Sequence, residues 1–379
     1  MYDLIVVGAG VWGTSAALAA LRQGARDVLL LEANFGAAEE SSAKSGGIVT
    51  ALLWNAQDRA FVERSRELYR EAAELGGDGS VWRRTGMLTL GGPKERDLLE
   101  GRAAQAEREG ATAELLDGGE VRRRFPDLDR LGDDAIGLFT PDDWHVNPTA
   151  YAQAALGEAR RLGLTLRTGA RVVGISARVG SAEVRLQDGS VHQGARVLVS
   201  AGCWTRKLLA PSGVEIPLRP YRTQLSSLRL GSVHRELPVV WHLPTDIYLV
   251  PEGAQDILAG DGTEYKESDP DAFRREGDPF FVESVAERLI ALTRLGDAAG
   301  LRSAWAGLCG ATPDRRPLVG AVGPSLFCAC GDQGIGVMRG PAIGELAAKV
   351  ALGAAQEGDL SPLRLPAADF PIRGGFTLD

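Results

Sequence analysis

The sequence has few residues of the kinds that bind metal ions or form disulfide frameworks. Among 379 residues it has four cysteines and four histidines, and no pair of cysteines has CxxC spacing. These residues form no Cys/His cluster with the spacing of a zinc site, so the sequence predicts no bound metal. Cys328 and Cys330 alternate within an apolar run, which is typical of two small core residues on one strand face.

Long hydrophobic runs and dense basic blocks are also missing. The apolar runs are shorter than the roughly 20 residues of a membrane-spanning helix, and the first residues lack the basic and apolar leader of a secretory signal. The net charge is −8 without a Lys/Arg block, so we expect no nucleic-acid partner. These features predict a cytoplasmic protein with no transmembrane segment.

Glycine, by contrast, is abundant, with 48 residues. This content implies many turns and close backbone approaches, as nucleotide-binding proteins need. Hydrophobic residues make up 44% and charged residues 24% of the chain, as in globular proteins. The length allows a large core and two domains.

The strongest motif opens the chain. Residues 4–7 form an apolar run typical of a buried strand, and Gly8, Gly10 and Gly13 follow it in GxGxxG spacing. Between a strand and a helix, such glycines permit a tight turn, approach of a pyrophosphate to the backbone and close helix packing. A second apolar strand ends on Glu32, 19 residues after Gly13, where a carboxylate accepts ribose hydroxyls. The pattern predicts a dinucleotide site.

Three further stretches concentrate small residues. Residues 41–47 form either a ligand-binding loop or a surface loop. Residues 201–204 follow an expected strand over residues 191–200, and they could approach the same nucleotide. A glycine-rich turn begins at Gly331 and leads to a helix that we expect to start near Pro341, a residue suited to a first helical turn.

Together these motifs resemble the FAD-dependent D-amino-acid-oxidase-like superfamily, and within it the group of glycine oxidase, sarcosine oxidase β-subunit and dye-linked proline dehydrogenase. The pieces that carry the resemblance occur in family order: residues 8–13, Glu32, 41–48, 199–204, 305–308, 312–314 and 331–341. The resemblance implies an α/β fold, with a Rossmann-like FAD-binding domain and a second, mixed-sheet α+β substrate domain. The expected FAD-binding domain comprises residues 1–84, 142–218 and 304–379, and the substrate-binding domain comprises 85–141 and 219–303.

The resemblance also assigns a cofactor, FAD, and the residues around it. It places the pyrophosphate at the first glycine turn, the adenosine ribose at Glu32 and the adenine beside Val172 or Val173. The residues expected to contact FAD are Gly8, Gly10, Val11, Trp12, Gly13, Glu32, Ala33, Ser41, Ser42, Lys44, Ser45, Gly46, Gly47, Ile48, Val172, Val173, Ala201, Gly202, Trp204, Gly307, Cys309, Gly331, Gly334, Ile335, Gly336, Val337 and Met338.

The implied reaction is oxidation of the C–N bond of a secondary amine or amino acid, similar to sarcosine, glycine or proline. A hydride passes to the flavin, an imine forms, and oxygen or another acceptor takes the electrons. Tyr248 matches a tyrosine of the glycine oxidase substrate pocket; the alternative is an ordinary half-buried strand tyrosine. The family position of a flavin-linked cysteine falls near Gly307, so we expect noncovalent FAD, although Cys309 is close.

The chain departs from the family where a substrate carboxylate is bound. Cys309 and Gly334 stand where relatives carry arginines, and Met338 stands where monomeric sarcosine oxidases carry a lysine. A buried carboxylate needs a fixed cationic or multi-donor partner, and Arg222 and Arg339 are candidates.

Two alternative functions stay open at this point. The chain could be an FAD-dependent hydroxy-acid dehydrogenase, or the flavin-carrying subunit of a multi-subunit amine dehydrogenase or oxidase. An oligomer is possible in either case. Among the histidines, His145 is the best candidate for a position near the flavin at the domain interface, although a structural role is the simpler interpretation.

Overall fold

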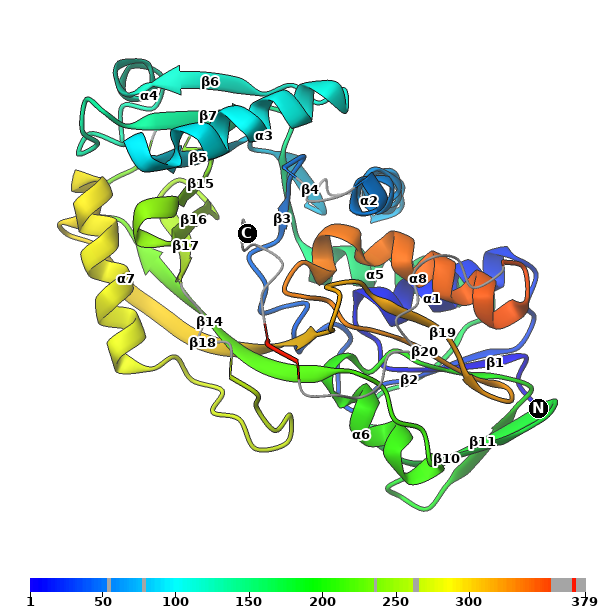
Figure 1. The fold of residues 1–379 in the computed structure, drawn as a ribbon. Helices are drawn as coiled ribbons and strands as arrows, with labels where there is room; N and C mark the ends of the chain where they lie inside the picture. Colours follow the sequence, from blue (N-terminus) through cyan, green and yellow to red (C-terminus); the bar gives the residue numbers. More distant parts are fainter. Residues whose placement is uncertain (53–55, 77–79, 235–236, 262–265, 356–369, 373–379) are drawn as a thin grey trace.

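A parallel sheet built on the first strand forms the centre of one half of the molecule (Figure 1). The computed structural model describes residues 1–52, 56–76, 80–234, 237–261, 266–355 and 370–372. The sheet has the order β19-β20-β13-β1-β2-β9, and only β19 runs antiparallel to its neighbour. Its strands are β1 (Leu4–Val7), β2 (Val28–Leu31), β9 (Thr165–Arg167), β13 (Val197–Val199), β19 (Leu318–Gly323) and β20 (Leu326–Cys330).

Both faces of this sheet are covered, which explains why its central strands β1, β2 and β13 are continuously apolar. One face packs under four helices, α1 (Val11–Arg22), α2 (Ala56–Gly76), α5 (Pro148–Arg161) and α8 (Gly336–Leu352). The other face packs against α6 (Thr205–Leu209) and a small antiparallel sheet of β10 (Val172–Arg178), β11 (Ser181–Leu186) and β12 (Val191–Gly194). Cys328 and Cys330 are both buried in the core between the parallel sheet and this small sheet, as predicted.

The single strand expected over residues 191–200 is wrong. The chain leaves the small sheet after Gly194 and enters the parallel sheet at Val197, so two strands replace one. Between them, the N–H of Ala195 donates to the carbonyl of Tyr2. The two strands also differ in burial, because β13 is buried throughout while only Gly194 of β12 is buried.

Helix α8 begins at Gly336 rather than near Pro341. Proline lacks the N–H that would bond the carbonyl one turn earlier. That carbonyl belongs to Val337, and the hydroxyl of Tyr69 donates to it at 2.8 Å. A side chain of α2 thus replaces the missing bond, and the proline lies inside the helix.

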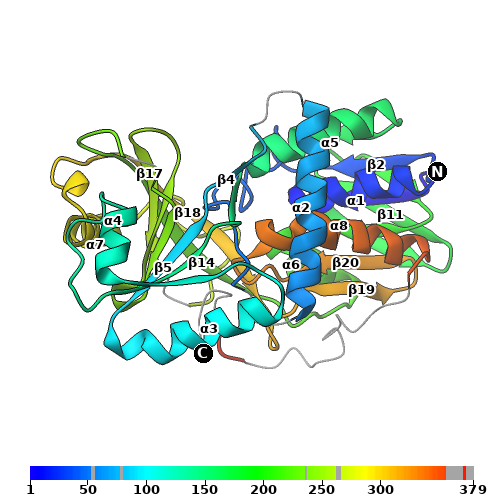
Figure 2. The same ribbon diagram turned by 90° about the horizontal axis from the view of Figure 1, so that it is seen from above.

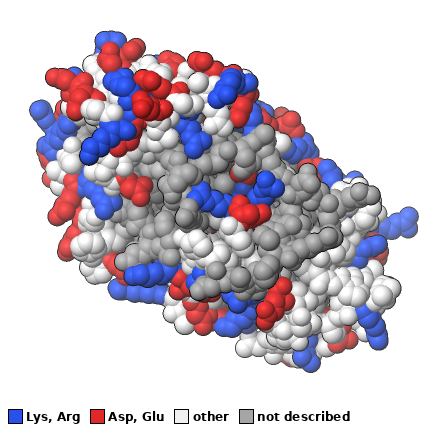
Figure 3. All heavy atoms as spheres, in the orientation of Figure 1, with Lys and Arg blue, Asp and Glu red and all other residues white. Residues whose placement is uncertain are grey.

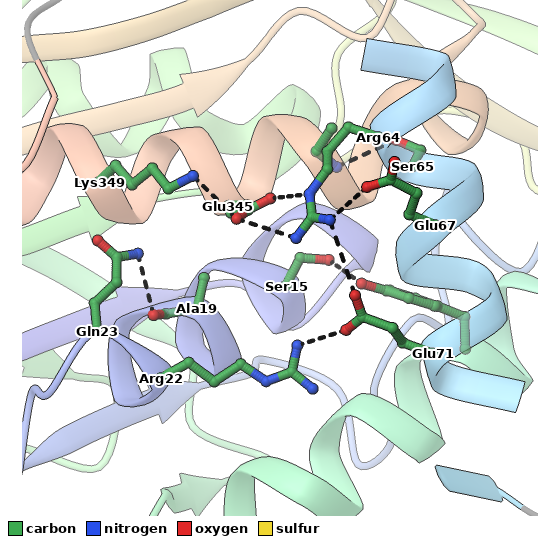
Figure 4. A network of polar contacts seen from close by, with 12 residues as sticks. Ser15, Ala19, Arg22, Gln23, Arg64, Ser65, Glu67, Glu71, Glu345 and Lys349 are labelled. Carbon is green, nitrogen blue, oxygen red and sulfur yellow. Dashed lines mark hydrogen bonds and ion pairs between the residues drawn. The ribbon is translucent and has the colours of Figure 1, made fainter. Parts of the chain in front are cut away.

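The helices over the parallel sheet are also joined by a polar network (Figure 4). Arg64 of α2 donates through Nε to Glu345 of α8 at 2.7 Å, and Arg22 of α1 pairs with Glu71 of α2 at 2.9 Å. The helices α1 and α8 pack closely as well, because a Cβ on Gly344 would lie 2.3 Å from the carbonyl oxygen of Trp12.

The other half of the molecule is a mixed sheet of eight strands in the order β18-β14-β17-β16-β15-β5-β7-β6. The strands are β5 (Met87–Gly91), β6 (Glu114–Asp117), β7 (Ile136–Thr140), β14 (Arg219–Arg229), β15 (Val239–His242), β16 (Ile247–Pro251), β17 (Asp256–Asp261) and β18 (Gly300–Ala311). One face packs against α4 (Gly118–Arg124) and α7 (Pro279–Leu292), while α3 (Arg96–Arg108) covers β6 and β7 from the other side.

The two halves meet along β14 and β18 and at a small sheet of β3 (Ile48–Val49), β4 (Trp82–Arg84) and β8 (Trp144–Val146). Figure 2 shows β14 and β18 between the halves. Because β18 pairs with β14 along its length, the domain boundary expected at residue 304 falls inside a strand. The larger sheet therefore extends to Ala311.

On the face drawn in Figure 3, Lys and Arg side chains lie beside Asp and Glu side chains. None of the described helices is long and apolar enough to span a bilayer.

Candidate cofactor and active site

A cavity of about 860 Å³ lies between the carboxyl ends of the parallel strands and one face of the eight-stranded sheet. The carboxyl edge of a parallel sheet is where α/β proteins bind nucleotides. The structure brings all the predicted cofactor residues except Gly13 to this cavity. Its lining includes Gly8, Gly10, Val11, Trp12, Glu32, Ala33, Ser41, Ser42, Lys44, Ser45, Gly46, Gly47, Ile48, Val172, Val173, Ala201, Gly202, Trp204, Gly307, Cys309, Gly331, Gly334, Ile335, Gly336, Val337 and Met338.

The three glycines of the first turn have different roles. Gly8 has φ +100°, and a Cβ there would lie 2.4 Å from the carbonyl oxygen of Ser200. Gly13 packs α1 onto the turn, because its Cβ would lie 1.9 Å from the carbonyl oxygen of Gly8. Gly10 faces the cavity, where the nearest atom to an added Cβ is Oγ of Ser42 at 3.5 Å. Of these three glycines, Gly8 and Gly13 are therefore needed for the turn itself, and only Gly10 has open space where its Cβ would be.

Two helices present their N-termini to this one cavity. The N-cap residues, Gly10 of α1 and Ile335 of α8, make no side-chain capping hydrogen bond, and in α1 the N–H of Val11 donates to Oγ of Ser42 at 3.3 Å. The two ends are joined by Trp12, whose Nε1 donates to the carbonyl of Gly336 at 2.8 Å. The first-turn N–H groups of a helix and its dipole favour negative charge, so the cavity suits an anionic ligand at both places.

Glu32 occupies the end of β2. Its carboxylate accepts hydrogen bonds from the N–H groups of Ala9 at 2.7 Å and Asn34 at 2.8 Å. Burial raises the pKa of Glu32, while these N–H groups act in the opposite direction. The hydrogen bonds fix the carboxylate at the cavity wall, where its remaining lone pairs can accept ribose hydroxyls.

The third glycine turn is held by Asp332, which the sequence reasoning missed. Its carboxylate accepts from the N–H groups of Gly310 at 2.6 Å and Gly334 at 3.1 Å. This ties the turn before α8 to β18. The available signal was an acid between two glycines ahead of a helix, a pattern typical of side-chain-to-backbone turns.

The loop over residues 41–47 forms another wall. The Oγ of Ser42 accepts from the N–H of Val11 at 3.3 Å, and the hydroxyl of Ser41 donates to the carbonyl of Leu308 at 2.6 Å. Lys44 forms an ion pair with Glu40 at 2.7 Å. The loop therefore touches both α1 and β18, which explains why its residues belong to the cavity rather than to the surface.

Comparison with known proteins decides the identity of the bound group. Residues 3–350 match the family model described as DAO, FAD dependent oxidoreductase. This chain belongs to the FAD-dependent oxidoreductase family. The residues present fit FAD, because Gly10 leaves space at the N-terminus of α1 and Glu32 lies where a ribose would be held.

Curated relatives and solved structures agree with this assignment. The oxidoreductase is 27% identical over 285 residues to 4-methylaminobutanoate oxidase (formaldehyde-forming) of Paenarthrobacter nicotinovorans, covering 74% of this chain and 33% of that protein. It is 29% identical over 228 residues to monomeric sarcosine oxidase of Bacillus sp. (strain B-0618), covering 58% and 56%. In these alignments the chain spans less than two thirds of its relatives' lengths. Glycine oxidase from Geobacillus kaustophilus superposes with TM-score 0.83 at 22% identity, covering 96% of this chain and 97% of that one, and confirms the predicted fold.

Tyr248 lines the part of the oxidoreductase cavity whose wall is formed by the eight-stranded sheet. Its ring lies beside the loop of residues 41–47, since a Cβ on Gly46 would be 3.5 Å from its Cε2. On its other side the ring covers Gly260, where a Cβ would be 2.4 Å from the hydroxyl oxygen. The tyrosine therefore lies between the cofactor loop and β17.

Arg222 is not among the described residues that line the cavity. Side chains alternate along a strand, and its neighbours Tyr221 and Thr223 take the cavity side. Its guanidinium donates instead to Asp278 at 2.7 Å and to the carbonyl of Arg274 at 2.9 Å. The structure therefore places this candidate outside the described lining of the cavity.

Arg339 is also outside the described lining of the cavity. It is fully buried in α8 and forms an ion pair with Asp58 of α2. The structure therefore gives neither arginine candidate access to the site, although it places Tyr248 there.

His145 lies behind the cofactor loop and yields a pH prediction. Its Nδ1 accepts from Nε of Arg83 at 3.3 Å, and a Cβ on Gly47 would lie 3.1 Å from its Nε2. Burial, together with Arg83, lowers the pKa of His145 from 6.5 to about 4. Between these values the unfolded chain binds a proton that the folded chain does not.

The free energy of unfolding should therefore fall as the pH drops from about 6.5 to 4, by up to about 3 kcal/mol from this group. Denaturation of the protein and of His145→Asn at pH 7 and pH 4.5 would check this. We expect the variant to lose less stability between the two pH values, and equal losses would contradict the assignment.

Proposed function

We propose that this oxidoreductase oxidises the C–N bond of a secondary amine or amino acid. The main support is that one cavity joins the predicted FAD residues to the sheet face carrying Tyr248 and Trp241. The names of the relatives, which include a methylaminobutanoate oxidase and a sarcosine oxidase, favour an amine substrate.

FAD would supply the redox chemistry, accepting a hydride from the carbon beside the amine nitrogen and passing electrons to oxygen or another acceptor, while water hydrolyses the resulting imine. The protein's part is binding and orientation. Gly8, Gly10 and Glu32 would hold the adenosine diphosphate portion, and the first-turn N–H groups of α8 would stabilise negative charge at the flavin. Tyr248 would orient the amine against it.

FAD attachment is proposed to be noncovalent. Burial raises the pKa of the Cys309 thiol, and the nearby Asp332 raises it further. The thiolate is the reactive form of cysteine, so this environment disfavours attack on a flavin. A cytoplasmic location is also part of the proposal; all four cysteines lie in the described part of the chain and are unpaired, as is usual for reducing compartments.

The decisive experiment starts with absorption spectra of the purified protein before and after acid precipitation. We expect flavin that is released into the supernatant. The holoprotein is then mixed anaerobically with sarcosine, proline, N-methylated amines and 2-hydroxy acids. Bleaching of the flavin band by secondary amines or amino acids is the expected result, and bleaching by hydroxy acids alone would overturn the proposal. Activity that appears only after a second polypeptide is added would assign the subunit role instead.

A further inference from the structure

The cavity wall formed by the eight-stranded sheet carries negative but no positive charge. Among its described lining residues, the strands and the turn between β15 and β16 contribute aromatic, apolar and neutral polar side chains and one carboxylate, that of Asp246. No Lys, Arg or His of these described strands lines the cavity. A substrate carboxylate would therefore find no cation on this wall.

The cations elsewhere in the described lining are already engaged or lie at the adenine end. Lys44 and Arg275 both form ion pairs with Glu40: Nζ of Lys44 lies 2.7 Å from Oε2, and Nη1 of Arg275 lies 2.9 Å from Oε1. Lys207 pairs with Asp271 and Asp269. Arg171 lies next to Val172, one of the residues assigned to adenine. A cationic partner for an anionic group beside the reacting carbon would therefore have to leave one of these pairs or come from the adenine end.

Asp246, in contrast, is accessible from the cavity. It closes the turn between β15 and β16 in the left-handed conformation, with φ 50°, and its side chain is exposed. Its Oδ1 accepts from Nε1 of Trp241 at 3.3 Å, and Oδ2 has no hydrogen bond from the described residues. One carboxylate oxygen is thus fixed, and the other keeps its lone pairs for a ligand. Burial raises the pKa of Asp246, while the hydrogen bond from Trp241 and the charge of Arg288 act in the opposite direction.

Two aromatic side chains lie on the same wall. Trp241 and Tyr248 are direct partners across β15 and β16, so their side chains share a face of the sheet, and both line the cavity. Aromatic faces attract cations, and an ionised carboxylate accepts strong hydrogen bonds from an ammonium group. A carboxylate with neighbouring aromatic rings is a suitable environment for an alkylammonium ion.

We propose that the substrate is a diamine, with a secondary amine that is oxidised and a distal ammonium group that Asp246 and Trp241 bind, and that no carboxylate is attached to the reacting carbon. This inference rests on the proposed function and narrows its substrate class. Asp246 is here a specificity-determining residue, remote from the hydride transfer itself.

Three amines that differ only in their end group test this inference. N-methylpropane-1,3-diamine, N-methylbutylamine and 4-(methylamino)butanoate carry an ammonium, a methyl and a carboxylate at the same position. The rate of anaerobic flavin reduction by the holoprotein is measured as a function of each concentration. A hydrogen-bonded charge pair is worth about 1.5–3 kcal/mol, so we expect a second-order rate constant about 10- to 150-fold higher for the diamine than for N-methylbutylamine, with the carboxylate slowest.

The variant Asp246→Asn should lower the ratio of the diamine to the N-methylbutylamine rate constant by about 10-fold or more, by the same estimate. Glu215→Gln, which changes an exposed acid outside the cavity lining, is the matched control and should leave the ratio unchanged. Asp246→Lys should reverse the preference toward the carboxylate.

The outcomes separate this inference from the proposed function. If the carboxylate compound or sarcosine reduces the flavin fastest, or if Asp246→Asn leaves the ratio unchanged, the diamine assignment is wrong and amine oxidation stands. If no amine reduces the flavin while hydroxy acids do, both fail.

Discussion

Replacing Gly13 by alanine is expected to yield protein that purifies with little or no FAD. The added Cβ would lie 1.9 Å from the carbonyl oxygen of Gly8 and 3.0 Å from its carbonyl carbon, and both atoms belong to the backbone of the turn. Neither can rotate away as a side chain would, so α1 must move off β1. The first-turn N–H groups that face the cavity would move with it, and the pyrophosphate would lose them.

Overpacking of this kind costs about 1–3 kcal/mol of unfolding free energy. The measurements are the ratio of flavin to protein absorbance after purification and the midpoint of chemical denaturation. A Gly13→Ala protein with full FAD content would show that the close contact between helix and turn is not what positions the phosphates.

A second glycine provides the control. Gly157 lies in the interior of α5, is exposed, and has no atom within 4 Å of an added Cβ. Alanine is favoured over glycine in a helix interior by about 1 kcal/mol. Gly157→Ala should therefore keep its FAD and unfold at an equal or higher denaturant concentration, although the chemical change is the same.

Predictions from the sequence were accurate where the signal lies within a short stretch of the chain. The first turn is a local motif, in which the spacing of Gly8, Gly10 and Gly13 fixes strand, turn and helix within a dozen residues. The sequence alone therefore predicts the cofactor end of the site. Glu32 followed for the same reason, because β2 directly follows the helix.

The substrate end depended on contacts that spacing does not encode. Arg222 was a candidate because it is a cation in the right part of the chain, but its position on β14 directs it to Asp278, 56 residues away. The start of α8 was misplaced because the bond that replaces the proline N–H comes from Tyr69, 268 residues away. Asp246 belongs to no motif, and only the folded sheet places it beside Trp241.

Breaking the buried ion pair of Arg339 and Asp58 is expected to cause a large loss of stability. The side chain of Arg339 is fully buried, its guanidinium pairs with Asp58, and its Nε has no hydrogen-bond partner among the described residues. Replacing Asp58 by asparagine would remove the carboxylate that pairs directly with this buried guanidinium. Breaking a buried pair in this way costs about 3–5 kcal/mol, so Asp58→Asn should denature at a much lower denaturant concentration.

A surface pair gives the comparison. Nη1 of Arg124 lies 2.6 Å from Oε2 of Glu114, but the two side chains are 38% and 39% exposed. Water screens such pairs, which contribute about 1 kcal/mol or less, so Glu114→Gln should change stability little. Equal losses in Glu114→Gln and Asp58→Asn would contradict the importance of burial.

The double variant Asp58→Leu/Arg339→Met separates structure from catalysis. Replacing a buried ion pair by apolar side chains of similar volume is often neutral or stabilising, so the double variant should be more stable than Asp58→Asn. It should also still bind FAD and be reduced by amines, because Arg339 lies outside the described lining of the cavity. A stable, FAD-loaded double variant that no amine can reduce would instead return Arg339 to the substrate site. If amines still reduce the flavin of the double variant, the charge of Arg339 has a structural role: it joins α2 to α8, the helix whose N-terminus faces the cofactor cavity.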